Sequence, residues 1–292
     1  MSDLKRKGGD NHNASRKKKY RSDGTPMWGK RHIDGPGIWV SCVKGKEKQT
    51  VGEMYDLFES VASDIWPVGG AEDKEKTGDS DDEEELSIED QIKKEMSEMK
   101  RPRAEQRFAN CQTDTPCVVF ISCKPPVDPV ELVVKYIESV AKTGATRSRY
   151  THRLVPVSGT CSANLNEMKS LCEKVFGAFF EKEKGKTFKY KVELRIRNHT
   201  VLARPAIIQH IASWVPEGHT VSLDNPDIFI LVEVFKSVCG VSIVHDYYKY
   251  AKFNVLELSN KVNAQKIASE PDSIKMGPSP VQEPVQQETE EK

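Results

Sequence analysis

The sequence predicts an α+β protein that is built from two small domains. Short apolar runs at residues 37–43 and 117–123, bounded by glycine, proline or lysine, are typical of buried strands. Residues 188–196 alternate apolar with charged side chains, as expected for a strand that is buried on one face. Apolar side chains recur every three or four positions over residues 51–65 and 164–180, which indicates amphipathic helices. With 292 residues, the chain is long enough for two such domains.

The chain is electrically neutral overall, with 44 Lys and Arg against 44 Asp and Glu, but its charges are segregated. Residues 1–50 hold thirteen basic and five acidic side chains, whereas residues 72–90 hold eleven acidic and two basic ones. Residues 117–258 hold nineteen basic and fourteen acidic side chains. A basic arm, an acidic loop and a mildly basic core therefore cancel in the total, although a binding partner meets each of them separately.

Three segments are too polar to bury the apolar surface that would offset the entropy of ordering them. The basic run at residues 16–21 is typical of a nuclear localisation signal, a nucleic-acid-binding arm or a solubilising tail. The acidic loop either shields a basic surface from unspecific RNA, contacts a basic partner protein, or is a solvated insertion. We expect disorder in a basic arm (residues 1–35), an acidic loop (residues 68–86) and a Pro/Gln/Glu-rich tail (residues 259–292).

The first domain is expected to begin with a strand and a helix. The strand is at residues 37–43, and the helix at residues 51–65 ends before Pro67. After the acidic loop, a capping box at residues 87–90 predicts a helix to about residue 100, which we expect to pack on its own domain rather than to dock a partner protein. The buried strand at residues 117–123 follows.

The second half of the chain is expected to alternate helices with strands. Asp128 and Pro129 supply the N-cap and the first-turn proline of a helix, and an arginine-rich turn precedes the next strand. In order, the expected elements are a helix to about residue 142, a strand at 152–157, a helix at 164–180, a strand at 188–196, a helix at 205–214, and strands at 228–235 and 238–244.

No pattern of catalytic, cofactor-binding or metal-ligating residues stands out. Gly185-Lys-Thr187 lacks the glycine that a phosphate-binding loop needs upstream, because Phe180 occupies that position. The seven cysteines and seven histidines are scattered without zinc spacing, so we expect reduced and mostly buried thiols. Neither a signal peptide nor an apolar run near 20 residues is found, so secretion and membrane spanning are not expected. The sequence therefore predicts a binding protein that carries no cofactor of its own.

Basic side chains gather at two strand ends and predict a surface for RNA. A guanidinium donates two parallel hydrogen bonds to a phosphate and keeps its charge, which makes dense arginine typical of phosphate contacts. Recognition by shape and backbone is expected, because the major groove of an A-form helix is too deep and narrow to be read. The alternative is a solvated strand face, and for Lys236 an exposed lysine is an equal alternative. The predicted RNA-binding residues are Arg147, Arg149, Arg153, Arg195, Arg197, Asn198 and Lys236.

Five short motifs, in order along the chain, resemble those of a THUMP domain. They are RLVP at residues 153–156 followed by Cys161, RIRN at 195–198, VSLDNPD at 221–227, VEVFK at 232–236 and GVSIV at 240–244. The flanking GIWV at 37–40 and LSIEDQIKKE at 86–95, together with the basic arm and the acidic loop, resemble small eukaryotic THUMP-domain proteins required for N4-acetylcytidine formation in tRNA. The resemblance covers about residues 36–255. It implies a ferredoxin-like domain at residues 36–127 followed by a THUMP domain at residues 128–250.

The resemblance also implies a function that the residue patterns alone do not. Members of this family act as adaptors that present serine and leucine tRNAs to a separate RNA cytidine acetyltransferase, and acetyl-CoA and ATP are expected on that partner enzyme. The implied location is the nucleus, in particular the nucleolus, with the cytoplasm as a further compartment. Two alternatives stay open: the chain is itself a tRNA acetyltransferase, or it is a general scaffold for structured RNA in ribosome biogenesis.

Overall fold

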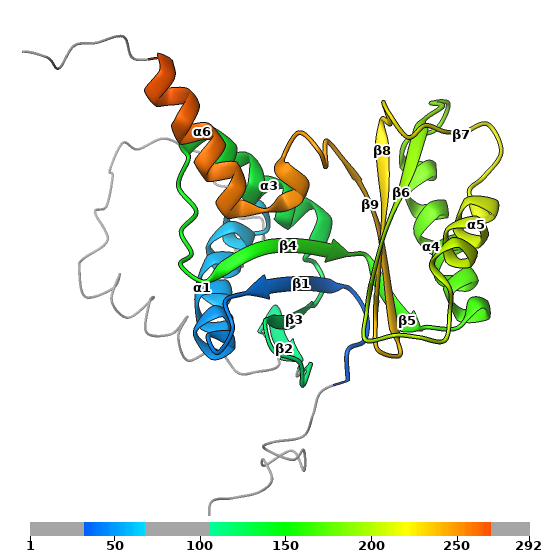
Figure 1. The fold of residues 1–292 in the computed structure, drawn as a ribbon, viewed down its shortest axis with the longest axis horizontal. Helices are drawn as coiled ribbons and strands as arrows, with labels where there is room; N and C mark the ends of the chain where they lie inside the picture. The colour runs from blue at the N-terminus through cyan, green and yellow to red at the C-terminus, as the bar shows by residue number, and fades with distance from the viewer. Residues whose placement is uncertain (1–31, 68–105, 112, 270–292) are drawn as a thin grey trace, which may run out of the picture.

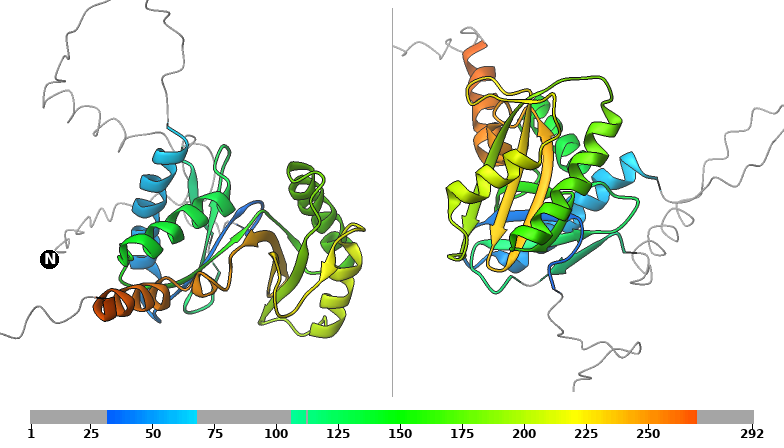
Figure 2. Two further views of the ribbon diagram at one scale, coloured as in Figure 1. Left: turned by 90° about the horizontal axis from the view of Figure 1, so that it is seen from above. Right: turned by 90° about the vertical axis from the view of Figure 1, so that its right-hand side faces the viewer.

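The computed structural model describes residues 32–67, 106–111 and 113–269, and these residues form two β-sheets with helices packed on each (Figure 1). The predicted acidic loop, the helix expected after the capping box, nearly all of the basic arm and the chain from residue 270 lie outside the described residues. The two sheets differ in strand direction and number, and they meet in the middle of the molecule (Figure 2).

The first sheet has the strand order of a ferredoxin-like fold. Its strands are β1 (Gly37–Cys42), β2 (Phe108–Cys111), β3 (Val118–Cys123) and β4 (Thr151–Val157), in the order β2-β3-β1-β4. Every neighbouring pair is antiparallel. Helices α1 (Glu47–Ile65) and α3 (Pro129–Thr143) pack on one face of this sheet (Figure 2). The order of helices and strands along the chain is that of the β-α-β-β-α-β unit.

Local sequence signals account for the helices of this domain. The side chain of Asp128 accepts hydrogen bonds from the amides of Val130 and Glu131, and α3 ends at Gly144, which adopts the left-handed backbone conformation with φ of 77°. The buried side chains of α1 include Met54, Leu57 and Phe58, which follow the predicted three- and four-residue spacing.

The second sheet is mixed and has five strands. Its strands are β5 (Gly159–Ser162), β6 (Lys189–Arg197), β7 (Thr220–Val221), β8 (Ile228–Phe235) and β9 (Val238–His245), in the order β5-β9-β8-β6-β7. Strand β6 runs parallel to both β7 and β8, whereas β9 is antiparallel to β8 and to β5. Helices α4 (Leu165–Lys182) and α5 (Arg204–Trp214) cover one face, and the first domain covers part of the other (Figure 1).

The predicted boundary between the domains is wrong. The prediction placed α3 and β4 in the second domain, which was expected to span residues 128–250, but β4 pairs with β1 over residues 151–157 and completes the first sheet. The chain passes from the first sheet to the second at Ser158, since β5 begins at Gly159 and pairs with β9. The prediction failed because strand pairing between distant segments leaves no local sequence signal.

The predicted disordered tail is also wrong in its first part. The chain returns to the first domain through a short 3-10 helix, η1 (Ala251–Phe253), and continues as α6 (Val255–Ser269). Val255 and Leu258 are buried in the core of the first domain, and the hydroxyl of Ser259 donates a hydrogen bond to the carbonyl of Gly144. Helix α6 therefore fastens the chain beyond the second sheet to α3 and β4 (Figure 1).

One continuous core joins the two domains. Phe229, Leu231 and Phe235 of β8 belong to the same buried cluster as Trp39 of β1, and the ring centroids of Trp39 and Phe235 are 4.9 Å apart. The hydroxyl of Ser242 donates a hydrogen bond of 2.7 Å to the carbonyl of Pro156 across the same junction. The described cysteines are all free thiols and five of the seven are buried, as predicted.

Candidate nucleic-acid interface

The charged face of β6 looks onto the junction between the domains. Alternation along the strand places Tyr190 and Leu194 in the core beneath α4 and α5, so Glu193, Arg195 and Arg197 lie on the opposite face. These three side chains are half-buried rather than fully solvated. The strand predicted to be half-buried is therefore confirmed, and its polar side faces a partly closed region instead of open solvent.

Glu233 lies beside Arg195 in that region. Arg195 of β6 and Glu233 of β8 are directly opposed in the parallel register, and their side chains approach to 3.4 Å between Nε and Oε1. Only 9% of the Glu233 side chain is exposed. Burial raises the pKa of Glu233 to about 7, although the positive charges of Arg195, Arg197 and Arg153 lower it. The desolvation of this carboxylate therefore outweighs the attraction of three neighbouring arginines.

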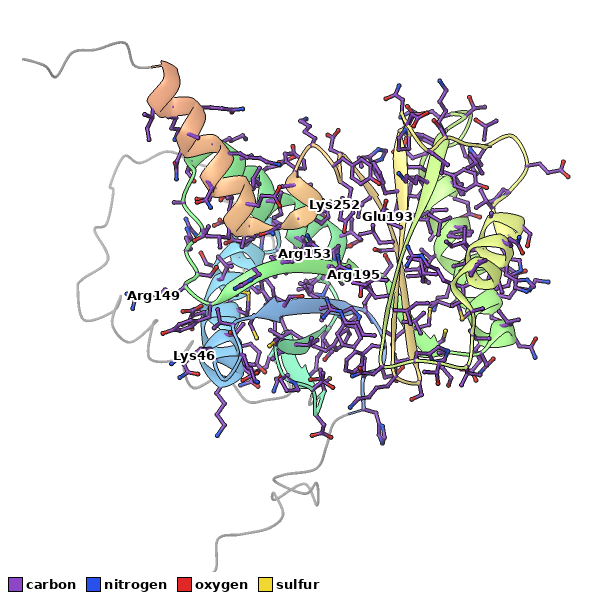
Figure 3. The ribbon with its side chains drawn as sticks, viewed as in Figure 1. Lys46, Arg149, Arg153, Glu193, Arg195 and Lys252 are labelled. Carbon is purple, nitrogen blue, oxygen red and sulfur yellow. The ribbon has the colours of Figure 1, made fainter. Side chains whose placement is uncertain are left out.

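Arg153 enters the same region from the first domain. It lies on β4, and Figure 3 shows it next to Arg195, near the place where the two sheets meet. The Nε of Arg153 is buried and has no hydrogen-bond partner among the described residues. Burial and, next, the charge of Arg195 lower the pKa of Arg153. We call Arg153, Arg195 and Arg197 the junction arginines; with Glu233 as their buried counter-ion they form a site with excess positive charge that suits an anionic ligand.

Other predicted residues at this junction hold the domains together. A guanidinium nitrogen of Arg197 donates a hydrogen bond of 3.2 Å to the hydroxyl of Ser41 on β1. The amino group of Lys236, at the turn between β8 and β9, donates a bond of 2.8 Å to the carbonyl of Thr113. Asn198 is exposed and adopts a left-handed conformation with φ of 53°, directly after β6. Lys236 is thus engaged with the first domain, while Asn198 remains accessible.

Arg147 and Arg149 do not join the junction arginines. Both are exposed in the loop that leads into β4, and the Arg149 amide donates a bond of 3.1 Å to the carboxylate of Glu53 on α1. Figure 3 places Arg149 and Lys46 together beside α1, away from Arg153 and Arg195. The amino group of Lys46 lies 5.4 Å from the ring centroid of Tyr150. The structure therefore divides the predicted basic surface into a junction site and an outer site beside α1.

The segment after β9 adds residues that the sequence analysis missed. Tyr248 is exposed, and its hydroxyl is hydrogen-bonded to the carboxylate of Glu193. The amino groups of Lys191 and Lys252 lie 4.9 and 5.0 Å from the centroid of its ring. Aromatic rings flanked by cations are common where proteins bind nucleic acid. The alternation of aromatic and basic residues at 247–252 was the available signal, because such interleaving is typical of nucleic-acid contacts.

The described part of the chain shows neither a metal site nor a membrane span. Among these residues, no three His, Cys, Asp or Glu side chains are grouped so that they could hold a metal ion. None of the described helices combines the length and the apolar character needed to cross a membrane.

Residues 162–244, from β5 to β9, match the model of the THUMP domain family. An uncharacterised protein of Schizosaccharomyces pombe is 32% identical over 224 residues, which are 76% of this chain and 75% of the relative. The chain belongs to the THUMP-domain family. The tRNA acetyltransferase TAN1 of Saccharomyces cerevisiae is 30% identical over 280 residues, which are 88% of this chain and 95% of that protein. THUMP domain-containing protein 1 of Mus musculus is 28% identical over 252 residues, covering 81% of this chain and 71% of the relative.

Together, the family model and the similarity to TAN1 cover both domains of the fold. The family model covers the second sheet and its helices, and the similarity to TAN1 extends over the ferredoxin-like domain as well. The junction arginines fall on both sides of this division, since Arg153 belongs to the first domain and Arg195 to the THUMP domain. The candidate site therefore requires both domains.

Proposed function

We propose that this chain is a tRNA-binding adaptor for N4-acetylcytidine formation, and that a separate RNA cytidine acetyltransferase carries out the chemistry. The observation that carries the proposal is the buried positive excess at the domain junction, in a chain similar to TAN1 along most of its length. The proposed substrates are serine and leucine tRNAs. The acetyl-CoA and ATP belong to the partner enzyme, and the complex works in the nucleus, in particular the nucleolus, with the cytoplasm as a further compartment.

The junction arginines would hold a phosphate of the tRNA backbone. The buried Nε of Arg153 has no hydrogen-bond partner among the described residues, and the carboxylate of Glu233, which pairs with Arg195, is only partly ionised near neutral pH. A phosphate brings the full negative charge and the acceptor oxygens that these guanidiniums lack. Tyr248, exposed beside them, offers a ring for a base or ribose, and the outer site at Arg149 offers a second backbone contact. Two separate anchors on a rigid frame select a folded RNA by its shape.

The test is mass spectrometry of tRNA nucleosides from cells that lack the protein. These cells are compared with the same cells after wild type or a variant has been reintroduced. The Arg153→Ala/Arg195→Ala variant is expected to leave N4-acetylcytidine absent from tRNA, while ribosomal RNA keeps it. Lys261→Ala is the control, because this exposed lysine of α6 forms an ion pair with Glu257 and is not one of the junction arginines. Thermal melting of the purified variants checks that they fold. Full rescue by the double variant would remove the junction from the RNA site, and unchanged acetylcytidine in the deletion strain would overturn the proposed function.

The similarity to the tRNA acetyltransferase TAN1 favours one other candidate, in which the chain itself acetylates tRNA. Purified chain mixed with acetyl-CoA, ATP and tRNA distinguishes the two. The adaptor proposal expects no acetylcytidine until the partner enzyme is added. Product formed by the chain alone would make it the enzyme. Competition with an unrelated structured RNA belongs in the same experiment, because equal affinity for both RNAs would instead indicate a general RNA scaffold.

A further inference from the structure

A groove lies between the two domains, apart from the junction arginines. It has a volume of about 810 Å³ and runs between α3 of the ferredoxin-like domain and α4 of the THUMP domain, along the end of β9. Strand β8 separates β9 from β6, which carries Arg195. The groove and the proposed RNA site are therefore distinct surfaces of the same two-domain frame.

The groove combines an apolar floor with an acidic rim. Val134 of α3 and Leu171 and Phe179 of α4 contribute to the floor. Lys174 and Lys182 are the lysines among the lining residues. The acidic lining residues are Asp34, Asp128, Glu131, Glu138, Glu183 and Asp246. Such a surface fits a segment that carries both apolar side chains and positive charge.

Part of the acidic rim has no counter-charge in the described protein. Glu183 pairs with Lys186, and Asp246 pairs with Lys249. By contrast, Asp34, Glu131 and Glu138 form no ion pair with another described residue. Uncompensated carboxylates above an apolar floor favour a cationic occupant over an RNA, whose phosphates they would repel.

The N-terminal segment of the chain is joined to residues that line this groove. Asp34, Gly35 and Pro36 line it, and the arm of residues 1–31 is joined to them through two residues. The arm holds ten Lys and Arg against three Asp. Met27 and Trp28 follow its basic run and supply apolar side chains. Trp28 stands six residues before Asp34, so even an extended chain places it within roughly 20 Å of that residue, which itself lines the groove.

We propose that the segment around Met27 and Trp28 docks in the groove between α3 and α4, with the neighbouring arginines and lysines against the acidic rim. A short tether gives an effective concentration in the millimolar range, so even a weak intrinsic affinity keeps the groove occupied. The occupant contacts both domains at once and holds the basic run on the side of the molecule away from the junction arginines. The arm and an RNA can therefore be bound together.

The test is photo-crosslinking of the full chain with benzoylphenylalanine in place of Trp28. Mass spectrometry is expected to find crosslinks to residues of α3 and α4 that line the groove, such as Val134 and Leu171. Mixing isotopically light and heavy protein separates links within one chain from links between two chains. The yield of groove crosslinks is expected to fall at least threefold in the Glu131→Lys/Glu138→Lys variant.

The control variant is Glu173→Lys/Glu181→Lys. It changes the net charge equally, but both residues are exposed on α4 and lie outside the groove lining, so the yield is expected to stay that of wild type. If the first variant fails to fold, wild type in 0.5 M salt is the second test, and there too the groove crosslinks should decrease. Wild-type crosslinks that fall only outside the groove would overturn the proposal. Crosslinks only between light and heavy chains would do so as well, and would identify a second copy as the occupant.

Discussion

The proposed binding of tRNA at the junction arginines is expected to weaken as the pH rises from 6 to 8, because Glu233 loses its proton in this interval. Burial raises the pKa of Glu233 to about 7, so about nine in ten molecules are protonated at pH 6 and about one in ten at pH 8. The ionised carboxylate competes with a phosphate for Arg195 at 3.4 Å. If the phosphate binds only beside the protonated form, the affinity falls about tenfold over these two pH units.

The Glu233→Gln variant isolates this effect. The amide keeps the shape of the protonated side chain and cannot ionise, so its affinity should be nearly independent of pH and about tenfold above that of wild type at pH 8. Fluorescence anisotropy with labelled tRNA at constant ionic strength measures both proteins at pH 6, 7 and 8. The control is Glu257→Gln: Lys261 lowers the pKa of this exposed carboxyl, so it stays charged throughout and its removal leaves the pH slope unchanged. A wild-type affinity that is flat with pH, or a slope retained by Glu233→Gln, would refute the reasoning.

The same ionisation has a consequence for stability, with a definite sign. The pKa of Glu233 in the folded protein is about 7, above its ordinary value of 4.5, so the folded state holds this proton more tightly than the unfolded state. Its contribution to stability is present at low pH and is lost as the pH rises through about 7. The difference between the folded and unfolded pKa values corresponds to roughly 3 kcal/mol in the free energy of unfolding. Urea unfolding at pH 5.5 and 8 should show a fall in stability for wild type that is smaller for Glu233→Gln.

Three further substitutions test separate parts of the structure. Arg195→Ala is expected to weaken tRNA binding by about 1–3 kcal/mol and to reduce the salt dependence by about one phosphate contact, and an unchanged salt slope in anisotropy titrations would argue against a backbone contact. Gly240→Ala should destabilise the protein by about 1–3 kcal/mol, because the new Cβ would lie 2.7 Å from a methyl group of Val157. The control, Gly52→Ala, places its Cβ in open space on α1 and should not destabilise the protein. Urea unfolding compares the two variants. Leu258→Ala should cost about 2–4 kcal/mol, since this residue buries α6 against the first domain; an unchanged unfolding midpoint would mean that α6 is not attached there.

Segments with strong local signals were predicted well from the sequence. The alternation along β6, the apolar hairpin of β8 and β9, and the capped start of α3 all appear within two residues of their predicted positions. Strand β7 was missed because it has only two residues. Helix α6 was missed because its hydrophobic periodicity is weak: Val255 and Leu258 are buried, whereas Leu256 and Ile267 are exposed.

The sequence by itself determined most of the helices and strands, and which of them carry basic side chains. Only the tertiary structure decided which of those side chains meet. Arg149 and Arg153 are four residues apart, yet an extended chain separates them by about 13 Å, and the pairing of β4 with β1 carries Arg153 toward the second sheet while Arg149 stays beside α1. Arg153 reaches Arg195 and Glu233 because the two sheets pack on a common core. Contacts between residues so far apart in the chain depend on the packing of whole domains, to which no local pattern refers.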